Sequence, residues 1–344
     1  MTKEGRPMSE KITVHSNMLT LTRPAQQELI KQAGWELKWI MDPARRGWKP
    51  QEIEALLLER AEEIKYLFCG DTPLRRAFFA KAVNLRHVCM QGTGVDHIDL
   101  AAASEHGVLV SNAPGANAAT VAEMVLTLML ALTRRLVPLH NKFMEGAWKR
   151  IMADDLNGKT LGIVGLGNIG QRVARLARAF DMNVLFHNRT PRPDLAAALG
   201  CTQVDGLAEL LPRVDFLSLN LPATASDRPV IGRAELALLK PSAYVINTGR
   251  GNLVDLDALA EALAANRLAG AGLDVFPEEP MTREKLEAMA HPLYSLRNVV
   301  CTPHVAGTTE DAGIRTCQMG MDSLAATMRG ERAPNVLNPE VYER

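Results

Sequence analysis

The chain has 344 residues, its 39 lysine and arginine residues are balanced by 39 aspartate and glutamate residues, and 47% of it is hydrophobic. These are the proportions of a globular protein of about two domains. A formal net charge of zero supplies no positive field for nucleic acid or an anionic membrane, so neither is an expected partner.

The N-terminal residues 1–11 are polar and lack the apolar core of a secretion signal. The longest apolar stretch, 124–132, is about half of the ~20 residues that span a bilayer. We therefore expect a cytoplasmic protein without a membrane segment. The cysteines are widely spaced and predict reduced core thiols rather than a metal site. They are Cys69, Cys89, Cys201, Cys301 and Cys317.

The first third of the chain alternates short apolar runs with helical patterns, as βα units around a parallel sheet do. The expected strands are 12–14, 36–40, 64–68, 85–90 and 108–110, with helices after Pro24 and from Pro50 to about Ala61. A turn-rich break at 112–115 precedes a long apolar helix from Ala119 to Arg134. Because its apolar residues extend beyond one face, we expect this helix to leave an apolar patch and to form a homodimer interface.

A second series of short strands begins near Lys159. The expected strands are 159–165, 183–187, 215–219, 243–247, 270–275 and 298–302, each separated from the next by a helical stretch. This pattern predicts a doubly wound parallel sheet. One more helix is expected at 309–329.

Residues 165–170 read Gly-Leu-Gly-Asn-Ile-Gly and match G-x-G-x-x-G. The motif follows the expected strand 161–164 and opens a helix expected at 171–180, which is the βαβ setting of a dinucleotide site. Gly165 permits the tight turn, Gly167 lets the backbone approach a pyrophosphate, and Gly170 allows close helix packing. The N–H groups near Asn168 and Ile169, together with the helix dipole, are expected to bind the negative charge.

The second strand of this series ends at Asn188, Arg189 and Thr190, with no carboxylate to bind a ribose 2′-hydroxyl. Asn188 removes charge repulsion against a 2′-phosphate, and Arg189 and Thr190 offer donors to it. The sequence thus favours NADP over NAD. The alternative is a solvated Arg189 in a site that binds either cofactor.

Three further segments at expected strand ends carry reactive residue types, at 247–251, 274–280 and 302–307. The other recognisable segments are the glycine turn, Gly-Thr-Gly-Val-Asp at 92–96, Asn112 and Val-Ala-Glu at 121–123. In this order they resemble the D-isomer-specific 2-hydroxyacid dehydrogenases, which include glyoxylate/hydroxypyruvate reductases and phosphoglycerate dehydrogenases. The resemblance covers nearly the whole chain.

The resemblance implies a catalytic trio of Arg250, Glu279 and His304. Reduction of a 2-oxo acid places negative charge on the carbonyl oxygen, which must also receive a proton. His304 suits the acid and base role, and a carboxylate at Glu279 would favour the imidazolium and fix its tautomer. Arg250 can bind the substrate carboxylate and polarise the carbonyl.

The resemblance also implies an α/β architecture of two domains with the active site in the cleft between them. Residues 1–112 with 309–344 would form a flavodoxin-like substrate-binding domain, and residues 113–308 a Rossmann cofactor domain. Backbone N–H groups of Thr93, Gly94 and Val95 would bind the substrate carboxylate opposite Arg250. Further cofactor contacts are implied for Thr120, Thr248 and Asp274.

The expected activity is reduction of a small 2-oxo acid, such as glyoxylate or hydroxypyruvate, to the D-2-hydroxy acid. One alternative is a cofactor-sensing interaction protein, because the corepressors called C-terminal-binding proteins resemble this family. Another is a phosphoglycerate dehydrogenase without a regulatory domain, since only 40 residues follow His304. Formate dehydrogenases carry glutamine where Glu279 stands, which disfavours that relative. The segment 281–291 is longer than usual and could change the substrate.

Overall fold

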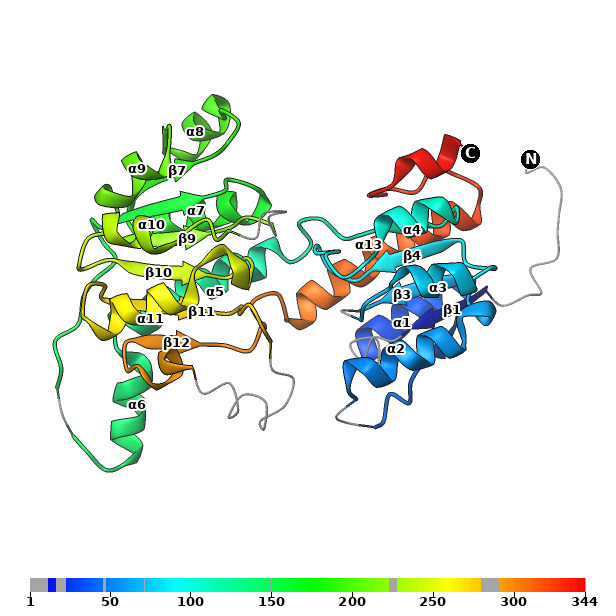
Figure 1. Cartoon of the computed structure of the whole chain (residues 1–344), viewed down its shortest axis with the longest axis horizontal. Helices are drawn as coiled ribbons and strands as arrows, with labels where there is room; N and C mark the ends of the chain where they lie inside the picture. The colour runs from blue at the N-terminus through cyan, green and yellow to red at the C-terminus, as the bar shows by residue number, and fades with distance from the viewer. Residues whose placement is uncertain are drawn as a thin grey trace. The chain divides into compact units, whose positions relative to one another are not determined.

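The computed structural model describes residues 12–16, 23–45, 48–70, 72–148, 150–222, 228–279 and 291–343. The chain forms two compact units (Figure 1), Met1–Asn117 together with Thr309–Arg344, and Ala118–Thr308. The chain passes from the first unit to the second after Asn117, whereas the family resemblance implied a boundary after residue 112.

The first unit contains a five-stranded parallel sheet in the order β2-β1-β3-β4-β5. Its strands are β1 (Ile12–Ser16), β2 (Trp35–Trp39), β3 (Tyr66–Cys69), β4 (His87–Met90) and β5 (Leu109–Ser111). This is the strand order of flavodoxin-like folds, so the predicted fold of this unit is confirmed.

Helices cover both faces of this sheet. On one face α1 (Pro24–Gln32) and α13 (Glu310–Met328) pack on side chains such as Phe68, and on the other lie α2 (Pro50–Glu59), α3 (Arg76–Lys81) and α4 (Leu100–Glu105). At Gly320 on α13 a Cβ atom would lie 2.5 Å from the Phe68 ring. The C-terminal helix therefore sits directly on the sheet.

A buried histidine ties α13 to two strands of the first unit. The His87 side chain on β4 is fully buried, with Nδ1 2.7 Å from Thr327 Oγ1 on α13 and Nε2 2.8 Å from Ser111 Oγ on β5. Burial lowers the pKa of His87 to about 3. The ring is therefore neutral in the folded protein over the physiological range of pH.

The second unit contains a seven-stranded parallel sheet in the order β12-β11-β10-β9-β6-β7-β8. Its strands are β6 (Thr160–Val164), β7 (Asn183–His187), β8 (Thr202–Val204), β9 (Phe216–Leu219), β10 (Tyr244–Asn247), β11 (Gly270–Leu273) and β12 (Val299–Cys301). Counted from β6, six of these strands follow the Rossmann order, and β12 extends it, so the predicted fold is confirmed. The sequence prediction missed the edge strand β8.

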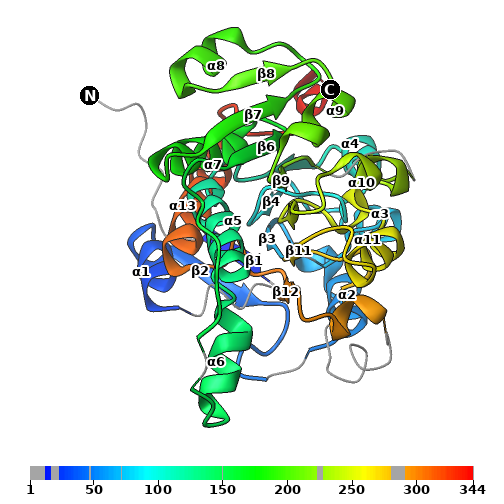
Figure 2. The same ribbon diagram turned by 90° about the vertical axis from the view of Figure 1, so that its left-hand side faces the viewer.

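Figure 2 shows α5 (Ala118–Thr133) and α7 (Asn168–Ala179) on one side of this sheet, with α10 (Arg233–Leu238) and α11 (Leu256–Ala264) on the other. The short helices α8 (Pro193–Leu199) and α9 (Leu207–Leu210) flank β8. Helix α5 packs closely on the sheet, because a Cβ atom at Gly272 would lie 2.9 Å from Leu128 Cβ. No large apolar side chain of α5 is exposed, so the patch expected between Ala119 and Arg134 is absent.

Most of the exposed large apolar side chains in the described part of this unit lie instead in the segment that follows α5. Helix α6 (Leu136–Met144), which the sequence prediction missed, has no buried residue, and Figures 1 and 2 show it projecting away from the sheet of its own unit. Large side chains in and after α6 are exposed. They are Leu136, Val137, Phe143, Met144, Trp148 and Met152.

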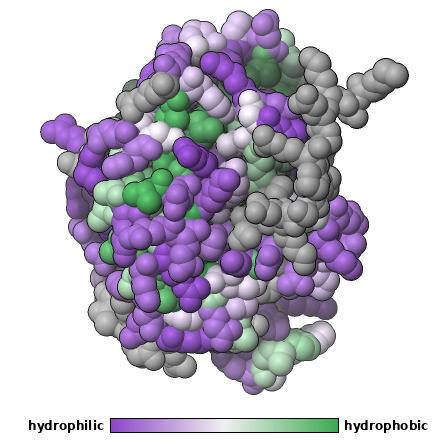
Figure 3. Space-filling view, turned by 90° about the vertical axis from the view of Figure 1, so that its right-hand side faces the viewer, coloured by the Kyte–Doolittle hydropathy of each residue, from purple (hydrophilic) through white to green (hydrophobic). Residues whose placement is uncertain are grey.

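None of the described helices has the length and apolar character needed to cross a membrane. The face drawn in Figure 3 is mostly hydrophilic, with smaller apolar areas between the polar side chains. All five cysteines are free thiols, and Cys69, Cys89 and Cys317 are buried as expected. Cys301 lies on the edge strand β12 and is exposed, so its prediction as a core residue is wrong.

Candidate active site

The strand order of the second unit reverses between β6 and β9, which are neighbours in the sheet. Ligands of doubly wound sheets bind at the carboxyl ends of strands where the order reverses. Gly165 follows β6 at this point, and Asn220 follows β9. The glycine turn therefore occupies the expected ligand-binding edge of the sheet.

The glycine turn has almost no room for side chains at two of its three glycines. Gly165 has a φ of +95°, and a Cβ atom there would lie 2.7 Å from the Asn220 carbonyl oxygen. At Gly170 a Cβ would lie 2.2 Å from the Gly165 carbonyl oxygen. By contrast, no atom lies within 4 Å of a Cβ built on Gly167. The turn is thus packed on its inner side and open at Gly167, as close approach of a pyrophosphate requires.

Helix α7 begins at Asn168, earlier than the expected start at Gln171. Its first N–H groups, on Asn168, Ile169 and Gly170, have no acceptor within the helix, and the N-cap Gly167 supplies no side-chain cap. Unsatisfied N–H groups at the positive end of a helix dipole bind anions. This end of α7 fits the pyrophosphate of a dinucleotide.

Asn188 follows β7 and supports the glycine turn, because its Oδ1 accepts a hydrogen bond of 3.0 Å from the Leu166 N–H. The neighbouring Arg189 and Thr190 are exposed. Asn188 thus has a structural role in the turn, and Arg189 and Thr190 remain accessible to a ligand.

Two buried polar atoms at the carboxyl ends of neighbouring strands lack a hydrogen-bond partner among the described residues, Asn220 Oδ1 and Thr248 Oγ1. Their residues directly follow Leu219 and Asn247, which are paired between β9 and β10. A buried polar atom without a partner is unfavourable, so these two fit hydrogen bonds from a bound cofactor. Asn220 was not predicted from the sequence, where its position directly after a buried strand was the available signal. Thr120 lies in the first turn of α5 and is buried.

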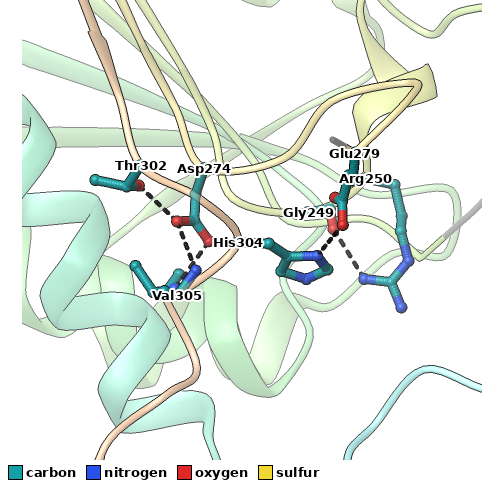
Figure 4. A network of polar contacts seen from close by, with 8 residues as sticks. Gly249, Arg250, Asp274, Glu279, Thr302, His304 and Val305 are labelled. Carbon is teal, nitrogen blue, oxygen red and sulfur yellow. Dashed lines mark hydrogen bonds and ion pairs between the residues drawn. The ribbon is translucent and has the colours of Figure 1, made fainter. Parts of the chain in front are cut away.

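The predicted acid and base pair meets at the same edge of the sheet. His304 follows β12 and Glu279 follows β11, and His304 Nδ1 lies 2.7 Å from Glu279 Oε2 (Figure 4). Since a carboxylate accepts hydrogen bonds, we assign the Nδ1 proton to this contact. The two side chains are 50% and 35% exposed, respectively, which leaves them accessible to a small substrate.

Arg250 lies on a loop after β10, and the side chain of Asn247 stabilises this loop by hydrogen bonds to its backbone. Asn247 is buried, its Nδ2 donates to the Arg250 carbonyl oxygen at 2.8 Å, and its Oδ1 accepts from the Gly249 N–H at 3.1 Å. The Arg250 Nη1 donates to the Gly249 carbonyl oxygen at 2.9 Å. This role of Asn247 was not predicted from the sequence.

The Arg250 loop packs against the segment that leads to Glu279. A Cβ atom at Gly251 would lie only 1.9 Å from the carbonyl carbon of Phe276. The segments that carry Arg250 and Glu279 are therefore in direct backbone contact, and Glu279 contacts His304. The structure brings the three predicted catalytic residues to one site on the second unit.

In the first unit, residues 92–95 form a loop after β4. Asn112 Nδ2 donates to the Thr93 carbonyl oxygen at 2.7 Å. Across the described ranges no group accepts a hydrogen bond from the N–H of Thr93, Gly94 or Val95. Successive backbone N–H groups of this kind can bind a carboxylate.

Of the long segment at 281–291, residues 281–290 lie outside the described residues. Its last residue, His291, has Nε2 3.1 Å from Asp257 Oδ1 on α11. No group of three or more potential metal-ligating side chains occurs among the described residues.

Comparisons with known proteins agree on one family. Residues 126–306 match the model for "D-isomer specific 2-hydroxyacid dehydrogenase, NAD binding domain". A D-3-phosphoglycerate dehydrogenase of Methanocaldococcus jannaschii is 39% identical over 82% of this chain, but the match spans only 53% of that protein. A glyoxylate reductase of Thermococcus litoralis is 36% identical over 86% of this chain and 90% of its own length.

Solved structures give the same result. The crystal structure of a putative D-isomer specific 2-hydroxyacid dehydrogenase from Polaromonas has a TM-score of 0.82 and 26% identity, and it covers 95% of this chain and 100% of that one. With the Rossmann sheet, the glycine turn and the site described above, the chain belongs to the D-isomer-specific 2-hydroxyacid dehydrogenase family of NAD(P)-dependent oxidoreductases.

Proposed function

We propose that this protein reduces a small 2-oxo acid of the size of glyoxylate or hydroxypyruvate to the D-2-hydroxy acid. The observation that carries the proposal is the 2.7 Å contact between His304 and Glu279 beside the Arg250 loop. The similarity to a glyoxylate reductase over 90% of that protein's length supports the choice of substrate.

His304 is the proposed acid for reduction and the base for oxidation. Glu279 accepts the hydrogen bond of Nδ1, which leaves Nε2 as the nitrogen that exchanges a proton with the substrate oxygen. The carboxylate also stabilises the imidazolium, so His304 can carry the proton until the carbonyl oxygen gains negative charge.

The substrate carboxylate is the proposed ligand of Arg250. A guanidinium remains charged at any working pH and can bind a carboxylate in two-point fashion while it polarises the carbonyl. We also propose that the N–H groups of Thr93, Gly94 and Val95 bind a substrate carboxylate, which the lack of acceptors for them in the described structure supports.

Bound NAD(P)H supplies the hydride. The N–H groups at the start of α7 would bind its pyrophosphate. The buried side-chain oxygens of Asn220 and Thr248 would form hydrogen bonds with its polar groups. We propose a preference for NADP. Exposed Arg189 and Thr190 follow β7, at the position where an acidic residue in other dinucleotide sites would repel a 2′-phosphate. The Oδ1 atom of Asn188 accepts a hydrogen bond from the glycine turn. Arg189 is therefore the residue that we propose binds the charge of the 2′-phosphate.

We propose that the protein is a homodimer through α6 and the residues that follow it. A nine-residue helix with no buried residue gains little stability from its own chain, since most helical stability comes from packing of an apolar face. The apolar side chains of this segment, together with the contact between the Phe143 and Trp148 rings, would be covered by a second copy of α6 in a symmetric interface.

The proposed function is tested by steady-state oxidation of NADPH and NADH, side by side, with a panel of 2-oxo acids. The panel contains glyoxylate, hydroxypyruvate, pyruvate, a longer 2-oxo acid and a phosphorylated 2-oxo acid. Turnover with the small acids, faster with NADPH, supports the proposal. Turnover of the phosphorylated acid alone would favour a phosphoglycerate dehydrogenase, and no turnover with any acid would favour a cofactor-sensing interaction protein.

A further inference from the structure

Asp274 is a fully buried carboxylate at the end of β11. Its Oδ1 accepts hydrogen bonds from the Thr302 hydroxyl at 2.5 Å and the Val305 N–H at 2.9 Å, and its Oδ2 accepts from the Ala306 N–H at 2.8 Å. Figure 4 shows these contacts beside the pair of His304 and Glu279. Both oxygens are thus used to hold one short segment of the chain, residues 302–306.

No lysine, arginine or histidine of the described chain forms an ion pair with Asp274. Its negative charge is balanced by donors of the 302–306 segment alone. Hydrogen bonds to a charged acceptor are roughly twice as strong as those between neutral groups. Asp274 therefore holds this segment more firmly than a neutral side chain would.

His304 lies inside that segment and has an unusual backbone conformation. Its φ is +53°, in the left-handed region that residues other than glycine rarely adopt. Such conformations persist when the surrounding contacts fix them. The Asp274 carboxylate binds the chain on both sides of His304, at Thr302 before it and at Val305 and Ala306 after it.

The main chain adds to the same restraint, because the His304 N–H donates to the Asp274 carbonyl oxygen at 2.8 Å. The backbone angles of a residue set the direction of its Cα–Cβ bond. In this conformation the His304 ring reaches Glu279 Oε2 at 2.7 Å. A relaxation of φ to negative values would turn the imidazole away from this contact.

We propose that Asp274 is a positioning residue that fixes the left-handed backbone of His304 and so aims the imidazole at Glu279. The inference rests on the proposed acid and base role of His304. This role adds to the cofactor contact that the family resemblance implies, because three donors of the 302–306 segment already bind the carboxylate oxygens.

The test is Asp274→Asn, which keeps the shape but replaces one acceptor oxygen by an NH2 donor that faces a backbone N–H. A displacement of about 1 Å at a catalytic group costs on the order of 100-fold in rate. We expect kcat to fall about 10- to 100-fold, with KM for the 2-oxo acid and the Kd of NADPH, measured by fluorescence titration, within about two-fold of wild type. The downfield proton NMR signal of the His304 Nδ1–H, assigned by its absence in His304→Gln, should disappear.

Two further variants separate positioning from general stability. Thr302→Ser keeps the hydroxyl and should retain kcat, whereas Thr302→Val removes it and should lower kcat in the same direction as Asp274→Asn. Asp255→Asn is a matched control, because Asp255 Oδ1 accepts from the Ala258 N–H at 2.9 Å at the start of α11, away from the 302–306 segment. It should lower the melting temperature and leave kcat unchanged.

Three results would overturn the inference. One is a kcat for Asp274→Asn within two-fold of wild type, and another is a loss of kcat matched by an equal loss of NADPH affinity, which would make Asp274 a cofactor ligand. The third is a retained His304 N–H signal in Asp274→Asn. The NMR measurement needs no substrate, so it decides the inference even if the wild-type protein reduces no 2-oxo acid. If Asp274→Asn fails to fold, Thr302→Val provides the same readouts.

Discussion

Replacing Gly251 by alanine tests whether the close backbone packing between the Arg250 loop and the Glu279 segment fixes the positions of both residues. A Cβ atom at Gly251 would lie 1.9 Å from the Phe276 carbonyl carbon, 2.1 Å from its oxygen and 2.3 Å from the Pro277 nitrogen, whereas real Cβ contacts essentially never fall below 3.0 Å. All three neighbours are backbone atoms, so no side-chain rotation relieves the overlap. The two segments must separate by about 1 Å to reach an ordinary contact.

The expected cost has two parts. Forcing extra volume into a packed site costs about 1–3 kcal/mol of unfolding free energy, which for a unit of this size lowers the melting temperature by roughly 2–10 °C. A displacement of about 1 Å between Arg250 and Glu279 should lower kcat by about 100-fold. The Kd of NADPH should rise less than kcat falls, because the glycine turn lies on a different loop and Thr248 alone among the proposed cofactor contacts lies on the Arg250 loop.

The assay compares thermal unfolding, kcat and NADPH binding of Gly251→Ala with those of Gly206→Ala. Gly206 precedes α9 with a φ of −160°, and nothing lies within 4 Å of a Cβ built there, so its variant should match the wild type in kcat and nearly in stability. A folded Gly251→Ala protein with kcat within three-fold of wild type would refute the close contact between the two segments.

Three other predictions concern the cofactor, stability and assembly. Arg189→Ala should weaken NADPH binding at least ten-fold in a fluorescence titration and change NADH binding little; an equal loss for both would contradict the NADP preference. Burial lowers the pKa of His87 to about 3, so below pH 6.5 the unfolded chain binds a proton that the folded protein does not, and stability falls with pH down to about 3. Between pH 6.5 and pH 5 the free energy of unfolding, measured with denaturant, should fall by about 2 kcal/mol less in His87→Gln than in wild type. Parallel plots of unfolding free energy against pH for the two proteins would be inconsistent with a neutral buried ring. Phe143→Asp on α6 should convert a dimer into a monomer in analytical ultracentrifugation; a monomeric wild type would reject the α6 interface.

The sequence predicted both parallel sheets because most strands are continuous apolar runs bounded by turn residues. The edge strand β8 (Thr202–Val204) escaped prediction because three residues with a polar centre give no periodic signal. Helix α6 was not predicted from the sequence. Sequence patterns identify a helix by an apolar face that packs on the core, and α6 has no buried residue. The sequence favoured α5 as the homodimer interface because α5 is the more apolar helix. In the structure its apolar side chains are covered by its own unit.

The candidate site was predictable as residue types and order, and less so as geometry. The motifs identified His304 and Glu279, which meet at 2.7 Å. The positive φ of His304 has no signature in sequence, since it depends on contacts from Asp274, a residue far along the chain. The unsatisfied oxygen of Asn220 is likewise visible only when the neighbouring strand ends are in place.

The most direct test of the account measures kcat for glyoxylate reduction by NADPH in wild type and His304→Gln, together with the Kd of NADPH for each. A positioned acid and base group contributes roughly 100- to 10,000-fold to the rate. We expect an active wild type, a loss of kcat of that size in the variant, and a Kd of NADPH within about two-fold of wild type. Activity of His304→Gln within a few-fold of wild type would contradict this expectation.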